Sequence, residues 1–305
     1  MDINADLTNP SNKKPQNPSS LFATLPFLPK PILKPERYLK SVRAKRTILS
    51  ELPPRIANFE NLSFNSVYLP MPDPHKKPYD GPTVIPILYG NYSVEGDRIL
   101  MTSSVILILD EKSNATATER CYILVDTGLP LFKNSLIGAF AAHGLKVTDI
   151  STIVLTHTDV DAVGNLNLFA LSDIYTENKV VNRQYVYVQK TAPSFDSRRS
   201  GLPFRPLCDN TDVFLTPGLT PRDLSVVVKN VTDYGTIAVV GNLISTESDL
   251  TSNTSVTEQS LDEEQEKLWR ATRSEVVCLA DYIVPGHGPT FKVTPAMKAS
   301  FGCAA

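Results

Sequence analysis

Apolar and polar positions alternate along residues 79–305 in patterns that predict short strands and two amphipathic helices. One helix is expected to begin at Pro130 and end near Gly144, and a second, about five turns long, to follow a capping box at 260–263. The expected strands are 83–89, 99–109, 121–125, 153–156, 180–189, 223–228, 236–240 and 281–284, with turns or loops at 91–97, 110–119 and 192–209. This order of elements predicts an α/β fold in which helices flank two sheets.

Residues 1–78 differ in composition from the rest of the chain. They contain 13 of the 24 prolines and many Asn, Ser and Lys residues. Most of this segment is therefore predicted to be a disordered N-terminal extension, attached to a domain at 79–305. The stretch 30–47 carries seven basic residues against one acid, Glu36. Its apolar stripe predicts a basic amphipathic helix packed on the domain, and a phosphate-binding or nuclear-targeting arm is the alternative.

Composition limits the class of protein further. The sequence contains no run of 18 apolar residues, so it predicts no transmembrane helix. Residues 1–20 lack the apolar core of a secretory leader. We therefore expect a cytosolic or nuclear protein in which the Asn-x-Ser/Thr sequons, such as that at Asn230, are chance matches. The net charge of −2 argues against a protein that coats nucleic acid. Reduced thiols are expected for the four scattered cysteines, which are Cys121, Cys208, Cys278 and Cys303.

The candidate chemistry lies just after the predicted strand at 153–156. His157, Asp159 and Asp161 occupy alternate positions there, and ionisable side chains at a strand end are a common way to build a site on a rigid element. His287 lies in a second candidate position, a Pro-Gly turn that follows the last predicted strand. Histidine and carboxylate side chains are the usual ligands of zinc and related metals.

The segment THTDVDAVGNLNLF resembles the H-x-H-x-D-H motif of the metallo-β-lactamase family. The blocks YILVDTGLP, TPGLTPRDLSVVV, GTIAVVGNL and ADYIVPGHGPTFKV extend the resemblance over about residues 86–293 and are similar to one subfamily. The resemblance implies a four-layer αββα sandwich whose metal site lies on loops at one edge of the sheets. It also implies kinship with a nuclease described as acting on histone pre-mRNA 3′ ends, and two zinc ions held by seven side chains.

Only part of the implied ligand set is present in this chain. The implied positions are His157, Asp159 and Leu219 for the first metal, Asp161, Ala162 and His287 for the second, and Asn242 for the bridge between them. His157, Asp161 and His287 match the family, whereas Asp159 stands in place of a histidine. Asn242 replaces the bridging carboxylate with a neutral amide, which offsets no cationic charge. The remaining two positions are aliphatic and have no donor atom.

The resemblance also implies supporting and interacting groups. Asp126, in the D-T-G block, is expected to orient the site by hydrogen bonds and not to bind metal. RNA or a small-molecule ester is the implied ligand, without a membrane partner, and a homodimer is kept as an alternative to a monomer.

The incomplete ligand set leads to two hypotheses about function. In the first, the binuclear zinc site is lost and the protein is a catalytically impaired or non-catalytic binding protein with no metal or one weakly bound divalent metal. In the second, a single-metal hydrolase or endoribonuclease uses His157, Asp161 and His287, with Asp161 in the catalytic role. Two other metal patterns remain open. They are an iron site of His157, Asp159 and His287, and an oxygen-rich Mn, Fe or Mg site of Asp159, Asp161 and Asn242.

Overall fold

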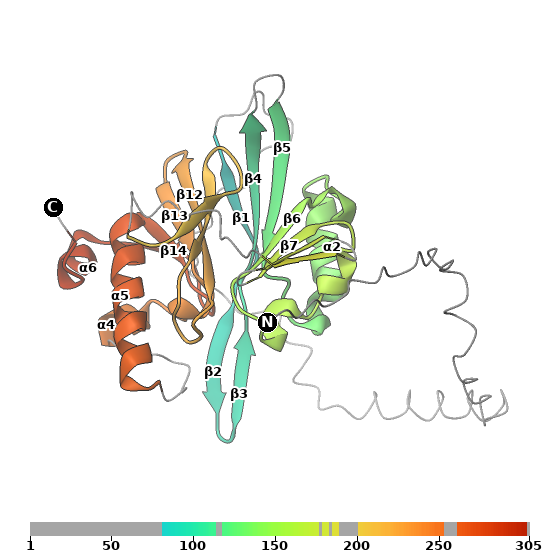
Figure 1. Cartoon of the computed structure of the whole chain (residues 1–305). Coiled ribbons are helices and arrows are strands. Elements are labelled where there is room, and N and C mark those ends of the chain that lie inside the picture. The colour runs from blue at the N-terminus through green and yellow to red at the C-terminus, as the bar shows by residue number, and fades with distance from the viewer. Residues whose placement is uncertain are drawn as a thin grey trace, which may run out of the picture. The chain divides into compact units, whose positions relative to one another are not determined.

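The structure is a computed structural model that describes residues 81–113, 118–176, 179–182, 185–188, 201–252 and 261–303. All of these residues belong to one compact unit, Asn65–Ala305. The predicted N-terminal extension at 1–78, with its basic stretch at 30–47, lies outside the described residues and remains a prediction. The described part contains two large sheets that face each other, with helices on their outer sides (Figure 1).

The first sheet has seven strands in the order β1-β4-β5-β6-β7-β8-β9. Neighbouring strands are antiparallel except for the β5–β6 and β6–β7 pairs, which are parallel. The helix α2 (Lys133–Ala142) makes the crossover between β5 and β6 and covers the outer face. The strands are β1 (Thr83–Leu88), β4 (Val105–Ser113), β5 (Thr118–Val125), β6 (Thr152–Leu155), β7 (Asp173–Thr176), β8 (Lys179–Asn182) and β9 (Tyr185–Val188).

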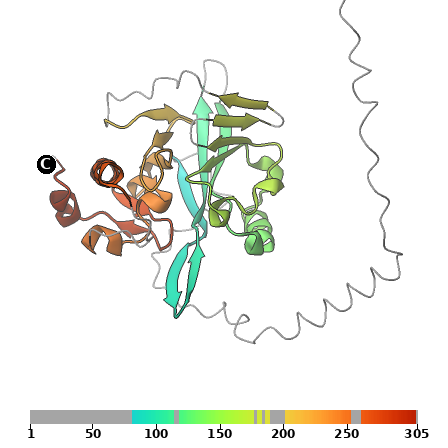
Figure 2. The same ribbon diagram turned by 60° about the horizontal axis from the view of Figure 1, so that its bottom comes forward.

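The second sheet has six strands in the order β10-β11-β12-β13-β14-β15. The β13–β14 pair is parallel, and its crossover contains α4 (Ser248–Ser252) and the long helix α5 (Glu263–Leu279). Figure 2 shows these orange and red helices on the side of the sandwich opposite the green helices. The strands are β10 (Phe204–Pro206), β11 (Thr211–Leu215), β12 (Leu224–Val231), β13 (Gly235–Val239), β14 (Tyr282–Val284) and β15 (Phe291–Lys292).

Apolar side chains alternate between the two faces of the strands and form three apolar layers, one between the sheets and one under the helices on each outer side. In β4, Ile106 packs between the two sheets while the next residue, Leu107, packs against the α2 side. In β12, Val226 faces the inter-sheet layer and Val227 faces the layer that contains Trp269 of α5. Successive strand residues point to opposite faces, so both faces of the sheets are buried at these positions in β4 and β12. The predicted four-layer αββα sandwich is confirmed.

The predicted strand at 99–109 is in fact two strands, β3 (Arg98–Thr102) and β4. Ser103 and Ser104 separate them, because both serine hydroxyls hydrogen-bond to other parts of the chain: Ser103 Oγ to Asp161 and Ser104 Oγ to the Pro285 carbonyl. The predicted turn at 91–97 is also wrong in its first part. Residues Asn91–Glu95 form β2, which pairs with β3 in a two-stranded sheet that extends from the sandwich (Figure 1).

Other boundaries shift for local reasons. The predicted strand at 180–189 is the hairpin β8–β9, and the predicted loop at 110–119 is shortened by the ends of β4 and β5. In α2, Leu136 is buried but Ile137 is 41% exposed, so the buried face is narrower than the apolar pattern suggested. The cap of α5 is Asp262, which exchanges hydrogen bonds with Gln265. No helix in the described ranges is both long and apolar enough to cross a membrane.

The remaining short helices lie at connections. They are the 3-10 helices η3 (Pro130–Phe132), η4 (Val147–Asp149), η5 (Leu166–Leu168) and η6 (Gly241–Leu243), and the α-helices α3 (Val160–Val163) and α6 (Pro295–Ser300). Of these, η6 carries Asn242 and α3 carries Asp161 and Ala162. Both helices therefore hold residues of the candidate site.

The expectation of reduced thiols is wrong for this structure, which pairs all four cysteines. Cys121 in β5 is joined to Cys208, which lies between β10 and β11, so this disulfide connects the two sheets. Cys278 in α5 is joined to Cys303, which follows α6. The partners are 87 and 25 residues apart in the sequence. No local spacing could reveal these pairs, because only the packing of the sheets and helices brings the partners together.

Candidate metal site

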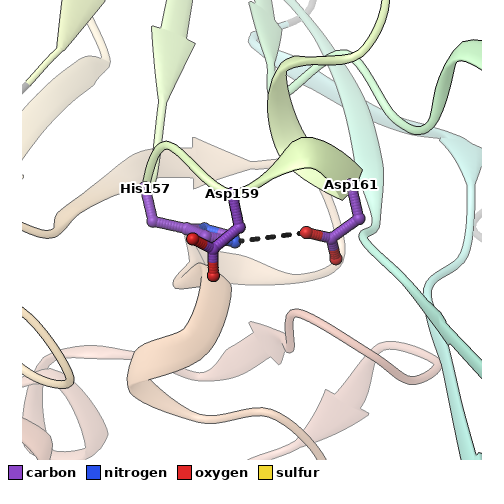
Figure 3. Close-up of side chains that lie close together, drawn as sticks. All are labelled: His157, Asp159 and Asp161. Atoms are coloured by element: carbon purple, nitrogen blue, oxygen red, sulfur yellow. Dashed lines mark ion pairs between the residues drawn. The ribbon is translucent and has the colours of Figure 1, made fainter. Parts of the chain in front are cut away.

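The end of the buried strand β6 positions the three principal side chains. After Leu155 the chain turns through His157 into the short helix α3, whose N-cap is Asp159 and whose second residue is Asp161. His157 and Asp161 are buried and Asp159 is exposed, and one ligand atom of each lies within 4.8 Å of the others. Figure 3 shows the three side chains extending to the same side of the loop. The alternate spacing in the sequence thus becomes a convergent group.

A hydroxyl group fixes the ring of His157. Thr156 donates its backbone N–H to Asp126 Oδ1 at 2.8 Å and its hydroxyl proton to Asp126 Oδ2 at 2.7 Å. The same Thr156 Oγ1 lies 2.8 Å from His157 Nδ1. Because its only proton is already donated, Oγ1 accepts from Nδ1–H, which leaves Nε2 of His157 facing the site. Asp126 therefore has the supporting hydrogen bonds expected of it.

The end of β3 holds two more candidate side chains. The Thr102 carbonyl lies 2.9 Å from His287 Nδ1, so this nitrogen donates and Nε2 is left free. The next residue, Ser103, donates to Asp161 Oδ2 at 2.6 Å. Neither supporting residue was predicted from the sequence. The pair of serines between two apolar runs was the available indication that the strand is interrupted here.

Buried polar atoms without a hydrogen-bond partner gather at this site. Among the described residues, His157 Nε2, Asp161 Oδ1, Asn242 Oδ1 and His287 Nε2 have no partner. Such atoms are uncommon in folded proteins because each lost hydrogen bond costs free energy. The Asn242 oxygen borders the turn before His287, since a Cβ added at Gly286 would lie 3.0 Å from it. Atoms from three separate loops thus remain available to a ligand.

The two aliphatic positions lie in the same region. Leu219 lines a pocket of about 310 Å³ together with His157, Asp159 and Asn242. Ala162 is fully buried beside Asp161, and its carbonyl accepts hydrogen bonds from the Thr127 N–H at 2.6 Å and hydroxyl at 2.9 Å. The structure therefore places Leu219 at the pocket that His157, Asp159 and Asn242 line, and Ala162 next to Asp161 in α3. Their surroundings are ordered and well packed.

The described side chains therefore provide only part of the ligand set of a two-metal centre. In the described part of the chain, one group of three residues, His157, Asp159 and Asp161, has ligand atoms close enough together for one ion. His287 is not in this group, although Asp161 and His157 both shift its pKa. The donor set fits a single divalent cation and does not supply the ligands of a second.

Charges in the site are strongly coupled. Burial lowers the pKa of His157, but the carboxylates of Asp161, Asp126 and Asp159 outweigh it and raise the pKa to about 9. His157 Nε2 lies 3.8 Å from Asp161 Oδ1, and burial of Asp161 is outweighed by His157 and Ser103, so that the pKa of Asp161 is lowered. His157 is therefore an imidazolium at neutral pH when no metal is bound. Burial lowers the pKa of His287, which is neutral there.

The pKa of Asp126, whose carboxyl group is linked to His157 through Thr156, is raised, in contrast to that of Asp161. Asp126 is fully enclosed, and burial raises its pKa to about 6 in spite of the His157 charge and the two hydrogen bonds from Thr156. Burial also raises the pKa of Asp223, which borders the same pocket. The site thus contains one cation and several carboxyl groups in a poorly solvated environment, where charges interact strongly.

Comparison with known proteins agrees with this geometry. Residues 108–287 match the model of the family described as "Metallo-beta-lactamase superfamily". The match covers more than half of the chain, which therefore belongs to the metallo-β-lactamase superfamily.

Among curated proteins, the chain is similar to "Metallo-beta-lactamase domain-containing protein 1" of Xenopus laevis, at 34% identity over 215 residues, covering 70% of this chain and 82% of that one. It is 30% identical to the protein of the same name from Homo sapiens over 237 residues, covering 71% of this chain and 84% of that one. Among solved structures, a putative metallo-β-lactamase of Thermotoga maritima aligns with a TM-score of 0.48 at 17% identity, covering 70% of this chain and 99% of that one.

Proposed function

We propose that this protein is a catalytically impaired member of its superfamily, which binds a small ligand and holds at most one divalent cation. The observation that carries the proposal is the pairing of an ordered site with donor-free side chains at Leu219 and Ala162. A binuclear hydrolase needs both metals to clamp the attacking and leaving oxygens. Here each implied metal position has lost a ligand, and Asn242 replaces the bridging carboxylate.

The protein's own charges support this proposal. The imidazolium of His157 faces the Asp161 carboxylate at 3.8 Å, so a proton balances part of the charge that a metal would balance in a complete centre. Ser103 and Thr156 hold both groups in place. The site is therefore organised without requiring a metal for its charge balance, as a binding role needs.

The pocket indicates the kind of ligand. Its volume of about 310 Å³ lies at the lower end of the range for small-molecule sites. Its lining residues include the apolar Leu155 and Leu219 and the hydroxyl-bearing Thr158, Thr176 and Thr220. We propose a small, partly apolar ligand with hydrogen-bonding groups, for which an ester is the family-based choice.

One specific observation favours a second candidate, a single-metal hydrolase or endoribonuclease. The unpartnered atoms His157 Nε2, Asp161 Oδ1, Asn242 Oδ1 and His287 Nε2 remain directed at the site. The residues that would hold the ion are His157, Asp159 and Asp161. A bound divalent ion would supply Lewis acidity and lower the pKa of a coordinated water. In this candidate Asp161, oriented by Ser103, is the principal catalytic carboxylate.

A variant that completes only the first metal position tests whether the missing donors limit metal binding and turnover. Asp159→His with Leu219→His would give three histidines around the pocket without disturbing the buried Ala162. We expect this variant to hold zinc tightly and to gain hydrolysis of aryl esters and RNA relative to the wild type. Asp159→Asn with Leu219→His is the matched control and should gain neither.

Metal content and turnover of the wild-type protein decide between the two candidates. Weak metal binding and turnover near background support the binding-protein proposal. Stoichiometric, tightly held metal with turnover that is abolished by His157→Ala would contradict it and favour the single-metal hydrolase.

A further inference from the structure

Three buried acceptor atoms of the candidate site have no hydrogen-bond donor among the described residues. They are Asp161 Oδ1, Asn242 Oδ1 and His287 Nε2. A carboxylate oxygen and an amide oxygen only accept hydrogen bonds, and the His287 ring accepts at Nε2 because its Nδ1 donates to the Thr102 carbonyl at 2.9 Å. Buried acceptors without a donor cost free energy. These atoms therefore indicate a ligand that donates hydrogen bonds.

The three acceptors lie on segments that the end of β3 and the turn before His287 hold together. Ser103 donates to Asp161 Oδ2 at 2.6 Å, and the carbonyl of the residue before Ser103 accepts from His287. A Cβ added at Gly286 would lie 3.0 Å from Asn242 Oδ1, so this oxygen borders the same turn. The family resemblance implies the second metal at Asp161 and His287 and the bridge at Asn242. The acceptors thus belong to the metal position whose ligand set is incomplete.

The charges around these acceptors favour a cationic ligand over an anionic one. The carboxylates of Asp161, Asp126 and Asp159 all act electrostatically on the ring of His157. Figure 3 shows Asp159 and Asp161 on the same side of the loop as His157. Three carboxyl groups against one imidazole leave an excess of negative charge whether or not the ring is protonated. In a poorly solvated site this excess attracts a cation and repels an anion.

We propose that the ligand of this protein carries a primary ammonium group, which takes the place implied for the second metal and donates hydrogen bonds to Asp161, Asn242 and His287. An ammonium group has three N–H donors and no acceptor, which matches the three acceptors without a donor. It supplies positive charge without requiring the ligand number and geometry of a zinc ion. The inference rests on the proposed function of a small-ligand-binding protein and names the charged group of that ligand.

The pocket accommodates the rest of such a ligand. Its volume is about 310 Å³, and Asn242 is one of its lining residues. Leu155 and Leu219 add apolar surface to the lining, while Arg222 and Asp223 add one basic and one acidic group. A short alkyl chain that extends from the ammonium group can therefore contact Leu219, which stands where the family has a histidine. The ligand class is a small primary amine with an apolar body.

The test uses full-length protein from which metal has been removed with a chelator. Three probes are titrated at neutral pH and constant ionic strength by ligand-observed NMR. They are n-butylamine, which is protonated, n-pentanol, which is uncharged, and butyltrimethylammonium, which is charged but has no N–H donor. We expect n-butylamine to bind at least about tenfold more tightly than either analogue and to shift the side-chain amide signal of Asn242. Equal affinities, or no binding of n-butylamine, would overturn the proposal.

Two substitutions at Asn242 test where the ammonium group binds. Asn242→Leu keeps a side chain of similar size but removes the acceptor, and it should lower the affinity for n-butylamine by about tenfold or more. Asn242→Asp adds a carboxylate and should raise that affinity by about tenfold. Effects in opposite directions cannot both come from loss of folding, which circular dichroism checks for each variant. The same change in affinity in both variants would contradict the placement at Asn242.

Failure of this inference can be told apart from failure of the proposed function. Tightly held metal and turnover in the wild-type protein would contradict the binding-protein function, and with it the ammonium group in place of a metal. Weak metal binding together with equal affinities for n-butylamine and n-pentanol would leave that function intact and overturn only the ammonium assignment.

Discussion

At the residue scale, one hydroxyl group connects the two sides of the candidate site. Thr156 Oγ1 donates to Asp126 and accepts from His157. We expect Thr156→Val to leave buried atoms of both partners unpaired, lowering the free energy of unfolding by about 1–3 kcal/mol and the zinc affinity by about tenfold or more. Urea denaturation and calorimetric zinc titration measure the two effects.

The neighbouring Thr158 offers a matched control for this substitution. Its side chain is exposed, and it lies at the pocket without belonging to the Asp126–Thr156–His157 network. Thr158→Val should leave both stability and zinc affinity close to the wild type. Equal losses in the two variants would show that the hydroxyl of Thr156 has no special role.

The raised pKa of His157 predicts how metal binding depends on pH. A protonated imidazole cannot bind a metal, and the pKa of His157 without metal is about 9. Zinc must therefore displace a proton at every pH below this value, and its affinity should rise by up to about tenfold per pH unit from pH 6 to pH 8. Calorimetric zinc titration in buffers with different ionisation enthalpies counts the released proton. A flat pH profile would contradict the protonated state assigned to His157.

The sequence predicts the site residues unevenly at this scale. His157, Asp159 and Asp161 could be grouped in advance because their spacing follows directly from the strand before them. Their supporting partners could not, since the contact from Ser103 to Asp161 spans 58 residues. The contact from Thr102 to His287 spans 185 residues. Such contacts depend on how the two sheets pack together.

At the scale of elements, the β2–β3 hairpin is fastened to the turn that carries His287. A Cβ added at Gly90 would lie 2.1 Å from the Gly286 carbonyl oxygen and 2.7 Å from His287 Cα. We expect Gly90→Ala to force these backbones apart and to lower the free energy of unfolding by about 3 kcal/mol or more. Thermal and urea denaturation measure the loss.

A glycine in α2 serves as the control for Gly90. A Cβ at Gly138 would meet no atom within 4 Å, and the residue lies inside a helix. Gly138→Ala should therefore leave stability unchanged or raise it by up to about 1 kcal/mol. If both alanine variants behave alike, the close approach of the hairpin to the His287 turn does not matter for stability.

The disulfides give another prediction about elements. In the chain-entropy model, closing a longer loop removes more freedom from the unfolded chain. Replacing Cys121 and Cys208 with Ser opens a loop of 87 residues, whereas replacing Cys278 and Cys303 opens one of 25. We expect each double replacement to lower the free energy of unfolding by about 2–5 kcal/mol, and the loss to be about 1 kcal/mol larger for the Cys121–Cys208 pair. Urea denaturation under oxidising conditions tests this order, and the reverse order would contradict it.

Strands with continuous apolar runs were the elements most accessible from the sequence. β5, β6, β12 and β13 were anticipated because both of their faces are buried, which leaves a clear apolar pattern. The hairpin strand β2 was mistaken for a turn, since it pairs only with β3 and its side chains are half-buried or exposed. Ser103 and Ser104 divided a predicted strand through hydrogen bonds that no local pattern could show.

At the scale of the whole molecule, the sandwich could be predicted but its covalent links could not. The order of strands and helices, with the family resemblance, led to the observed four layers, because helices must cover the outer faces of two mixed sheets. The cysteine pairs depend on distances across those layers. The same packing places Leu219 and Asn242 at the pocket beside His157 and Asp159, and Ala162 beside Asp161, which is the arrangement on which the proposed loss of the second metal rests.

The number of zinc ions that the wild-type chain retains tests the central claim most directly. Full-length protein is loaded with excess zinc at pH 7.5, passed through gel filtration, and assayed for zinc and protein by inductively coupled plasma mass spectrometry, with the Asp159→His and Leu219→His variant alongside. Our account predicts less than one zinc ion per wild-type chain and close to one for the variant. One or more zinc ions retained per wild-type chain would contradict the account, because metal that survives gel filtration is tightly held, and two would require a complete binuclear centre.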